Sequence, residues 1–88
     1  MRNSHKIAHM KQQPITAILA SNIKKKRAEL KLSQEKLSEL MNVSRLSIGL
    51  IETQKRWVSP EMLEKLATAL KCEEKDLFIR NDKWTIAH

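Results

Sequence analysis

Cysteine and long hydrophobic runs are scarce in this chain of 88 residues, and each scarcity excludes a class of protein. The single cysteine, Cys72, has no partner for a disulfide, so apolar burial must provide the stability of the fold. No hydrophobic stretch approaches the length of a membrane span, and no signal-peptide pattern is present. We therefore expect a soluble protein of a reducing cytoplasm, made of one small domain with tails.

The sequence also lacks the motifs of common catalytic sites. It has no glycine-rich phosphate loop, no nucleophile elbow and no pair of carboxylates that could form a cleft. His5 and His9 have helical i, i+4 spacing, but no third ligand lies near them in the sequence, so no metal site is predicted. Cys72 is interpreted as an ordinary buried thiol. We predict neither an enzyme nor a cofactor.

Basic residues are in excess, giving a net charge of +7, and they concentrate towards the N-terminus. Residues 1–32 carry eight basic residues and one acidic residue, residues 33–58 carry four and three, and residues 59–88 carry five and six. Such one-sided basicity suits a polyanionic partner such as DNA, or an acidic membrane surface. The run Lys24-Lys25-Lys26-Arg27 by itself indicates only a solvated helix face, but a motif lies directly downstream of it.

Hydrophobic periodicity predicts a bundle of short helices between a basic arm and a tail. Residues 1–14 are polar and aperiodic, which predicts a flexible arm, and helical patterning over residues 15–79 predicts a folded domain. The first helix is expected from Ile15 to about Lys31. Its periodic positions are Ile15, Ile18, Leu19, Ile23, Arg27 and Leu30. A fourth helix begins at Ser59-Pro60-Glu61, and its buried stripe is Met62 or Leu63, Leu66, Ala67 and Leu70. A short fifth helix is expected over residues 73–78.

Residues 32–52 predict two short capped helices around a tight turn. Ser33 is the expected N-cap of a helix whose apolar positions are Leu37, Leu40 and Met41. This helix ends at Asn42, which tolerates a left-handed backbone, and Ser44 caps a helix with Val43, Ile48 and Ile51 facing inward. A short loop forces the helices to cross steeply. The outer face of the second helix carries Arg45, Leu46, Gly49 and Leu50, as in a helix-turn-helix that enters a DNA major groove.

The segment from Leu19 to Phe78 resembles the XRE or Cro/C1 family of helix-turn-helix proteins, to which phage lambda repressor and Cro belong. The matching stretches are residues 23–30, 32–37, 43–44, 48–52, 60–70 and 76–78. This resemblance implies an all-α, compact five-helix domain with the helix-turn-helix at the second and third helices. It also implies binding to double-stranded DNA.

The resemblance places base-reading residues at the start of the third helix and on its outer face. They are Ser44, Arg45, Leu46, Gly49 and Leu50. Arg45 is expected to bond both acceptors of a guanine, and the alternative is a phosphate contact or none. The leucines would touch thymine methyl groups, unless they turn inward or meet another protein. Gly49 fits either close approach of the helix to DNA or a neutral surface position.

The resemblance also assigns phosphate-binding and structural residues. The phosphate-binding set is Gln34, Ser47, Thr53, Lys55 and Arg56, with ordinary solvation as the alternative for the two cations. Arg27 and Glu52 stand where the family has an ion pair that fixes the recognition helix to the scaffold. Trp57 is expected to pack under the loop after the third helix rather than to stack on a base. At four turns where family members often carry glycine, this chain has Lys31, Asn42, Gln54 and Lys71, which would be strained if the turns keep their shape.

Two functions from different classes remain open. The first is a sequence-specific DNA-binding transcriptional repressor that binds an inverted repeat as a homodimer, in a phage, restriction-control or antitoxin context. The second is a protein-interaction module, such as the antitoxin of a toxin pair, in which Leu46 and Leu50 bind the toxin and DNA binding is secondary. The expected dimer contact is the fifth helix with the tail of residues 80–88, because Phe78, Ile79, Trp84 and Ile86 exceed the apolar content of a solvated terminus.

Overall fold

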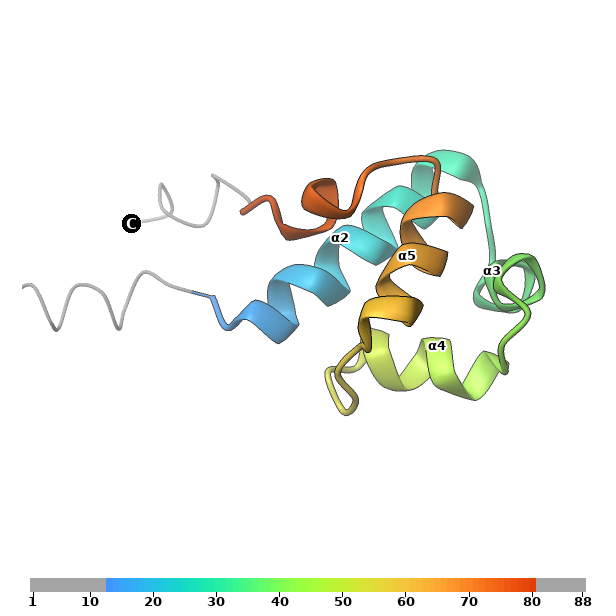
Figure 1. Ribbon diagram of the computed structural model, residues 1–88, viewed down its shortest axis with the longest axis horizontal. Helices are drawn as coiled ribbons and strands as arrows, with labels where there is room; N and C mark the ends of the chain where they lie inside the picture. The colour runs from blue at the N-terminus through green and yellow to red at the C-terminus, as the bar shows by residue number, and fades with distance from the viewer. Residues whose placement is uncertain (1–12, 81–88) are drawn as a thin grey trace, which may run out of the picture.

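The computed structural model describes residues 13–80, and these form an all-α domain (Figure 1). Its elements are α2 (Ile15–Leu30), α3 (Gln34–Met41), α4 (Arg45–Glu52), α5 (Pro60–Ala69) and the 3₁₀ helix η1 (Glu74–Phe78). The predicted compact helix-turn-helix fold is confirmed, with the expected fifth helix present as a single 3₁₀ segment. Within the described residues, no helix is long and apolar enough to cross a membrane.

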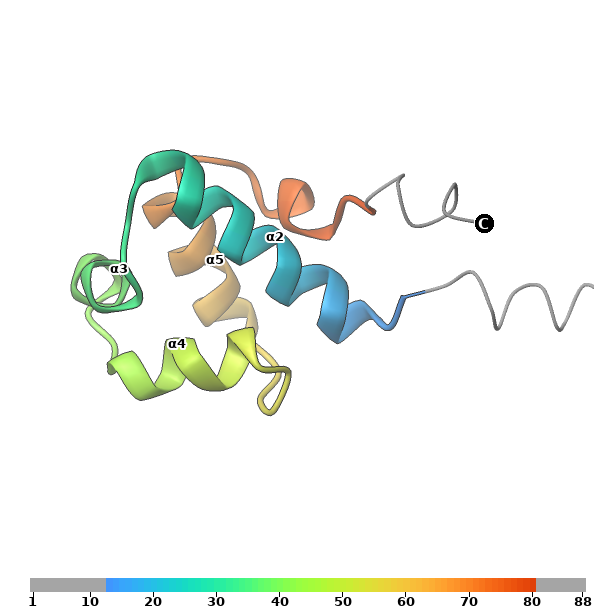
Figure 2. The same cartoon turned by 180° about the vertical axis from the view of Figure 1, so that it is seen from behind.

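The core lies between α2, α5 and the helix-turn-helix. Every element contributes at least one fully covered aliphatic side chain. The largest of these are Ile18, Leu19, Ile23, Leu37, Ile48, Leu66, Leu70 and Leu77. Seen from behind in Figure 2, α2 crosses the molecule diagonally with η1 packed against it. The Asn22 amide holds this contact by donating hydrogen bonds of 2.9 Å to the carbonyls of Leu77 and Ile79.

Serine caps set the starts of three helices where the sequence predicted them. The hydroxyls of Ser33, Ser44 and Ser59 accept backbone hydrogen bonds from Lys36, Ser47 and Met62 respectively. Each bond satisfies one of the backbone N–H groups that a helix leaves unpaired in its first turn. The three capping serines therefore determine the residues at which α3, α4 and α5 begin.

The four turns expected to be strained do keep a left-handed backbone. Lys31, Asn42 and Lys71 each have φ near 58°, and Gln54 has φ 66°. The first two end α2 and α3, and their backbone N–H groups bond to carbonyls of the preceding turn. The turn between α3 and α4 is thus very short, and the two helices pack directly on each other.

The expectation that Leu40 belongs to the buried stripe of α3 is wrong. Leu40 is 57% exposed, whereas the buried residues of the helix are Leu37, Ser38 and Met41. Successive residues rotate by about 100° in a helix, so Leu40 lies well away from the direction shared by these three. Ser38 can replace an apolar residue because its hydroxyl donates a 2.6 Å hydrogen bond to the carbonyl of Glu35.

Trp57 does not pack under the loop after α4 as expected. It is 48% exposed, and its ring centroid lies 6.4 Å from that of Phe78 in a tilted arrangement. The neighbouring Val58 is buried and takes the core position at this point of the chain.

Candidate nucleic-acid interface

One face of α4 is free of other elements of the domain. Figures 1 and 2 both show α4 along one edge of the molecule, with the core on one side of it. Ile48 and Ile51 face that core. On the outer side, Arg45 and Leu46 are exposed, and Leu50 is half-buried. The outer side of α4 is therefore accessible to a partner.

The two outward leucines differ in how they are exposed. Leu46 is 68% exposed, more than any other large apolar side chain that the structure describes. This exposure excludes the alternative that Leu46 turns into the core. Leu50, one turn later, is half-buried beside the loop that follows α4. The surface that α4 offers is thus partly apolar.

Gly49 is not required by the fold. A Cβ atom added at this position would have no heavy atom within 4 Å, and its backbone is not in the left-handed region. Glycine in a helix interior costs about 1 kcal/mol relative to alanine. Because no described atom occupies the space beside Gly49, that space is available to a partner.

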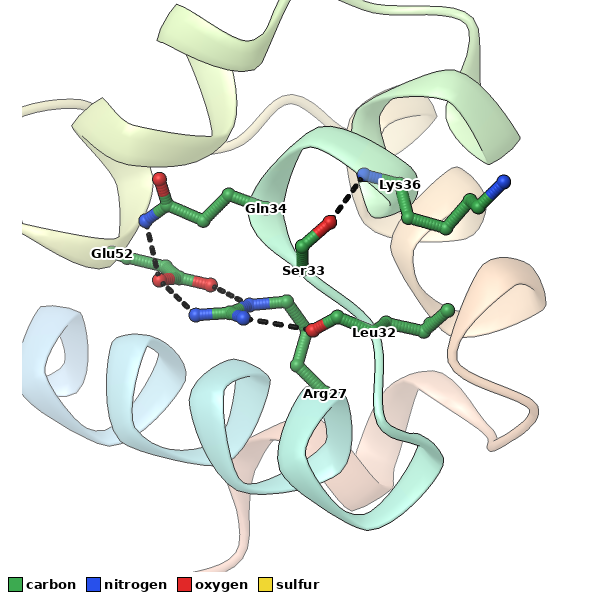
Figure 3. Close-up of polar contacts among 6 residues, drawn as sticks. All are labelled: Arg27, Leu32, Ser33, Gln34, Lys36 and Glu52. Carbon is green, nitrogen blue, oxygen red and sulfur yellow. Dashed lines mark hydrogen bonds and ion pairs between the residues drawn. The ribbon is translucent and has the colours of Figure 1, made fainter.

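Arg27, Glu52 and Gln34 form a network that joins three helices (Figure 3). Arg27 Nε donates to Glu52 Oε2 at 2.8 Å, and a terminal nitrogen of the same guanidinium donates to Oε1 at 2.9 Å. Gln34 Nε2 donates to the same Oε1, also at 2.9 Å. A further Arg27 N–H donates to the carbonyl of Leu32 in the connection between α2 and α3.

This network provides hydrogen-bond donors to a buried carboxylate. The Glu52 side chain is only 3% exposed, and three donors surround it. The hydrogen bond to Glu52 raises the pKa of Arg27 above its ordinary value, although burial acts in the opposite direction. The predicted pair thus has bidentate geometry and lies behind α4. Sequence reasoning missed the participation of Gln34 and of the Leu32 carbonyl.

The predicted phosphate-binding residue Gln34 already has a protein partner. One amide hydrogen is directed to Glu52, which leaves the second for an external acceptor. Gln34 is also the first residue of α3, where helix N–H groups are unpaired. Both features suit an anion at this helix end.

The loop after α4 brings two cations beside that helix. The backbone N–H groups of Lys55 and Arg56 both donate to the carbonyl of Leu50, at 2.8 and 3.2 Å. Thr53 directs its hydroxyl to the carbonyls of Gly49 and Leu50. Among residues 13–80, no carboxylate forms an ion pair with Arg45, Lys55 or Arg56. The three charges are therefore available to an anionic partner.

The other sequence candidates do not extend this surface. His5 and His9 lie outside the described residues. Cys72 follows α5, and burial is the main cause that raises the pKa of its thiol. A hollow of about 620 Å³ opens to solvent between α3 and α5. Its lining residues are Leu40, Met41, Glu61, Glu64, Lys65, Thr68, Ala69 and Lys71, none of which belongs to α4.

Comparison with solved structures finds several similar proteins. The restriction-modification controller protein C.AhdI from Aeromonas hydrophila is 35% identical over 72% of this chain and 96% of its own, with a TM-score of 0.69. A hypothetical transcription factor, NHTF, from Neisseria is 25% identical over 81% and 82% of the two chains, with a TM-score of 0.76. A transcriptional regulator from Vibrio cholerae is 25% identical over 73% of this chain and 36% of its own, with a TM-score of 0.68.

A comparison with curated protein sequences gives no match. A family model described as helix-turn-helix matches residues 23–77, which include all of α3, α4 and α5. That range covers more than half of the chain and contains the Arg27–Glu52 pair and the outward face of α4. The chain belongs to the XRE or Cro/C1-type helix-turn-helix family, whose members are DNA-binding transcriptional regulators rather than enzymes.

Proposed function

We propose that the protein represses transcription by binding an inverted repeat in double-stranded DNA as a homodimer. The observation that carries this proposal is the free outer face of α4, which carries Arg45 and lies beside Lys55 and Arg56, three cations that have no carboxylate partner among residues 13–80. Two copies of α4 would enter successive major grooves about 34 Å apart. The bound dimer would cover a promoter.

Base readout is assigned to the start and outer face of α4. The proposed base-reading residues are Ser44, Arg45, Leu46, Gly49 and Leu50. Arg45 is the single residue among them that can bond both acceptors of a guanine, which is worth about 1–3 kcal/mol of discrimination. Leu46 and Leu50 provide apolar contact for thymine methyl groups. The open space at Gly49 lets a base or sugar come close to the helix backbone.

Phosphate contacts are assigned to the two edges of the helix-turn-helix. Gln34 lies at the start of α3, and Ser47, Thr53, Lys55 and Arg56 lie along α4 and the following loop. Such contacts hold the register of the protein on the duplex but carry no sequence information.

We assign residues 15–79 to the DNA-binding domain and residues 1–14 to a basic arm. Similarity to C.AhdI supports control of a restriction-modification system as the biological context.

One observation favours a second function. Leu46 is 68% exposed in the first turn of α4, on the surface that would otherwise read DNA. An exposed leucine on a partly apolar helix face also fits a protein partner, such as the toxin of a toxin–antitoxin pair. In that case DNA binding would be secondary and would follow from the basic charge.

Selection of bound duplexes from a randomised DNA pool tests the proposal. The selection is made at near-physiological salt, where non-specific electrostatic binding is weak. An enriched inverted repeat with half-sites one helical turn apart is the expected result. If no sequence is enriched by protein that still binds DNA at low salt, the protein-interaction function is favoured instead.

A further inference from the structure

The side chain of Arg56 folds back along α4 although the residue lies beyond the end of that helix. One terminal nitrogen of its guanidinium donates a 3.2 Å hydrogen bond to Ser47 Oγ in the first turn of α4. The left-handed backbone at Gln54 reverses the chain, and the Leu50 carbonyl binds the N–H of Arg56. The loop thus brings the backbone of Arg56 beside Leu50 and its guanidinium beside Ser47.

The hydroxyl of Ser47 has two hydrogen-bond partners within the protein. A guanidinium has no acceptor, so Ser47 Oγ accepts from Arg56. Its second partner is Ser44 Oγ at 3.0 Å, which also accepts from the backbone N–H of Ser47. A hydroxyl has one donor and two acceptor sites, so two of its three sites are taken. Either serine can donate the hydrogen of this pair, and where Ser47 is the donor, a direct phosphate contact by its hydroxyl would have to break the bond to Ser44.

We infer that Ser47 is a positioning residue, which serves phosphate binding by orienting Arg56 and not by the direct phosphate contact assigned to it above. The inference rests on the proposed function, and it names Arg56 as the ligand of a DNA phosphate beside α4. Four guanidinium N–H groups remain after the bond to Ser47, enough for bidentate contact with a phosphate. Fixing this long side chain in advance reduces the entropy lost when it binds.

The inference is tested by a double-mutant cycle on the selected duplex. Ser47→Ala is expected to weaken binding about two- to tenfold, the range for one long side chain losing its preorganisation. In the Arg56→Ala background, the same change should have almost no effect, because no guanidinium is left to orient. Ser47→Thr keeps the hydroxyl and should restore most of the affinity.

Lys55→Ala provides the matched control, because Lys55 is a neighbouring cation for which the structure records no bond to Ser47. In this background, Ser47→Ala should cost the same factor as in the wild type. Arg56→Ala and Lys55→Ala should each reduce the slope of log affinity against log salt by about one. An equal cost of Ser47→Ala in the wild-type and Arg56→Ala backgrounds would mean that Ser47 contacts DNA directly and would overturn the inference.

A measurement on the free protein separates this inference from the proposed function. Nuclear magnetic relaxation of the Arg56 Nε–H group should report restricted motion in the wild type and increased motion in Ser47→Ala, on the picosecond-to-nanosecond timescale. Equal mobility in the two proteins would refute the positioning role. Failure to select any duplex would refute the proposed function, while the relaxation result would still decide whether Ser47 orients Arg56.

Discussion

At the scale of single residues, the outer face of α4 combines a cation, two leucines and the single glycine of the chain. Arg45 can form directional hydrogen bonds to a base edge, whereas Leu46 and Leu50 discriminate only through shape and apolar contact. Sequence discrimination by hydrogen bonding therefore depends strongly on one side chain. This dependence makes substitution of individual residues informative.

Arg45→Ala is expected to remove the preference for guanine at one position of each half-site. Loss of the bidentate contact should cost about 1–3 kcal/mol with the preferred duplex and much less with a duplex altered at that position. Binding titrations with both duplexes measure this difference. Lys55→Ala is the control, and it should weaken binding to both duplexes equally. If Arg45→Ala behaves in the same way as Lys55→Ala, Arg45 contacts a phosphate.

Gly49→Ala should have opposite effects on stability and on DNA binding. The added methyl group meets no atom within 4 Å, and alanine favours the helix, so the free energy of unfolding should rise by about 0.5–1 kcal/mol. The same methyl group would occupy the space proposed for DNA and weaken binding. Urea denaturation and binding titration measure the two effects. Unchanged binding by the stabilised variant would identify Gly49 as a neutral surface position.

At the scale of secondary-structure elements, the position of α4 depends on a buried carboxylate at its last residue. Glu52 connects α4 to α2 through Arg27 and to α3 through Gln34 (Figure 3). The outer face of α4 is therefore oriented from behind by charged hydrogen bonds as well as by Ile48 and Ile51 in the core. Removal of Arg27 would take away two of the three hydrogen bonds that the buried Glu52 carboxylate accepts among the described residues.

Arg27→Leu is expected to destabilise the domain by about 3–5 kcal/mol, the usual cost of leaving one member of a buried ion pair without its partner. Urea denaturation of the wild type and the variant measures the difference. Lys36→Ala is the control, because the Lys36–Glu39 pair is exposed and should contribute less than about 0.5 kcal/mol. Similar small losses for the two variants would mean that the Arg27–Glu52 pair contributes little to stability.

At the scale of the whole molecule, apolar side chains remain exposed at the end where the described chain begins and finishes. Ile15 is 48% exposed and Ile79 58% exposed, and Arg80 bonds to the carbonyl of Gln13 at 3.2 Å. Figures 1 and 2 both place these two segments at the same end of the domain. Trp84 and Ile86, also expected at a dimer contact, lie outside the described residues. We propose that a second copy of the chain covers this end.

Deletion of residues 80–88 should convert the proposed dimer into a monomer, because Trp84, Ile86 and the bond from Arg80 to the Gln13 carbonyl are all lost. Sedimentation velocity at several protein concentrations measures the change, and thermal unfolding checks that the domain remains folded. Ile79→Lys in the full chain should have the same effect by placing a charge in the contact. A dimer that survives both changes would exclude this end of the molecule as the interface.

Local patterns in the sequence were sufficient to predict most of the fold. The caps at Ser33, Ser44 and Ser59 and the helical exit at Asn42 depend on interactions within a few residues, which sequence spacing specifies directly. The exposure of Leu40 and the burial of Ser38 were not predicted. In a helix of eight residues, several apolar stripes fit the spacing, and packing against the other helices selects one of them.

The sequence by itself determined the helix order, the short turn between α3 and α4, and the residues that face outward from α4, because these follow from periodicity and capping. Only the tertiary structure decided that Gln34 shares Glu52 with Arg27 and that Arg56 returns to Ser47. These contacts join residues 9 to 25 positions apart in the chain. Their geometry depends on helix crossing and on the course of one loop, which residue spacing does not specify.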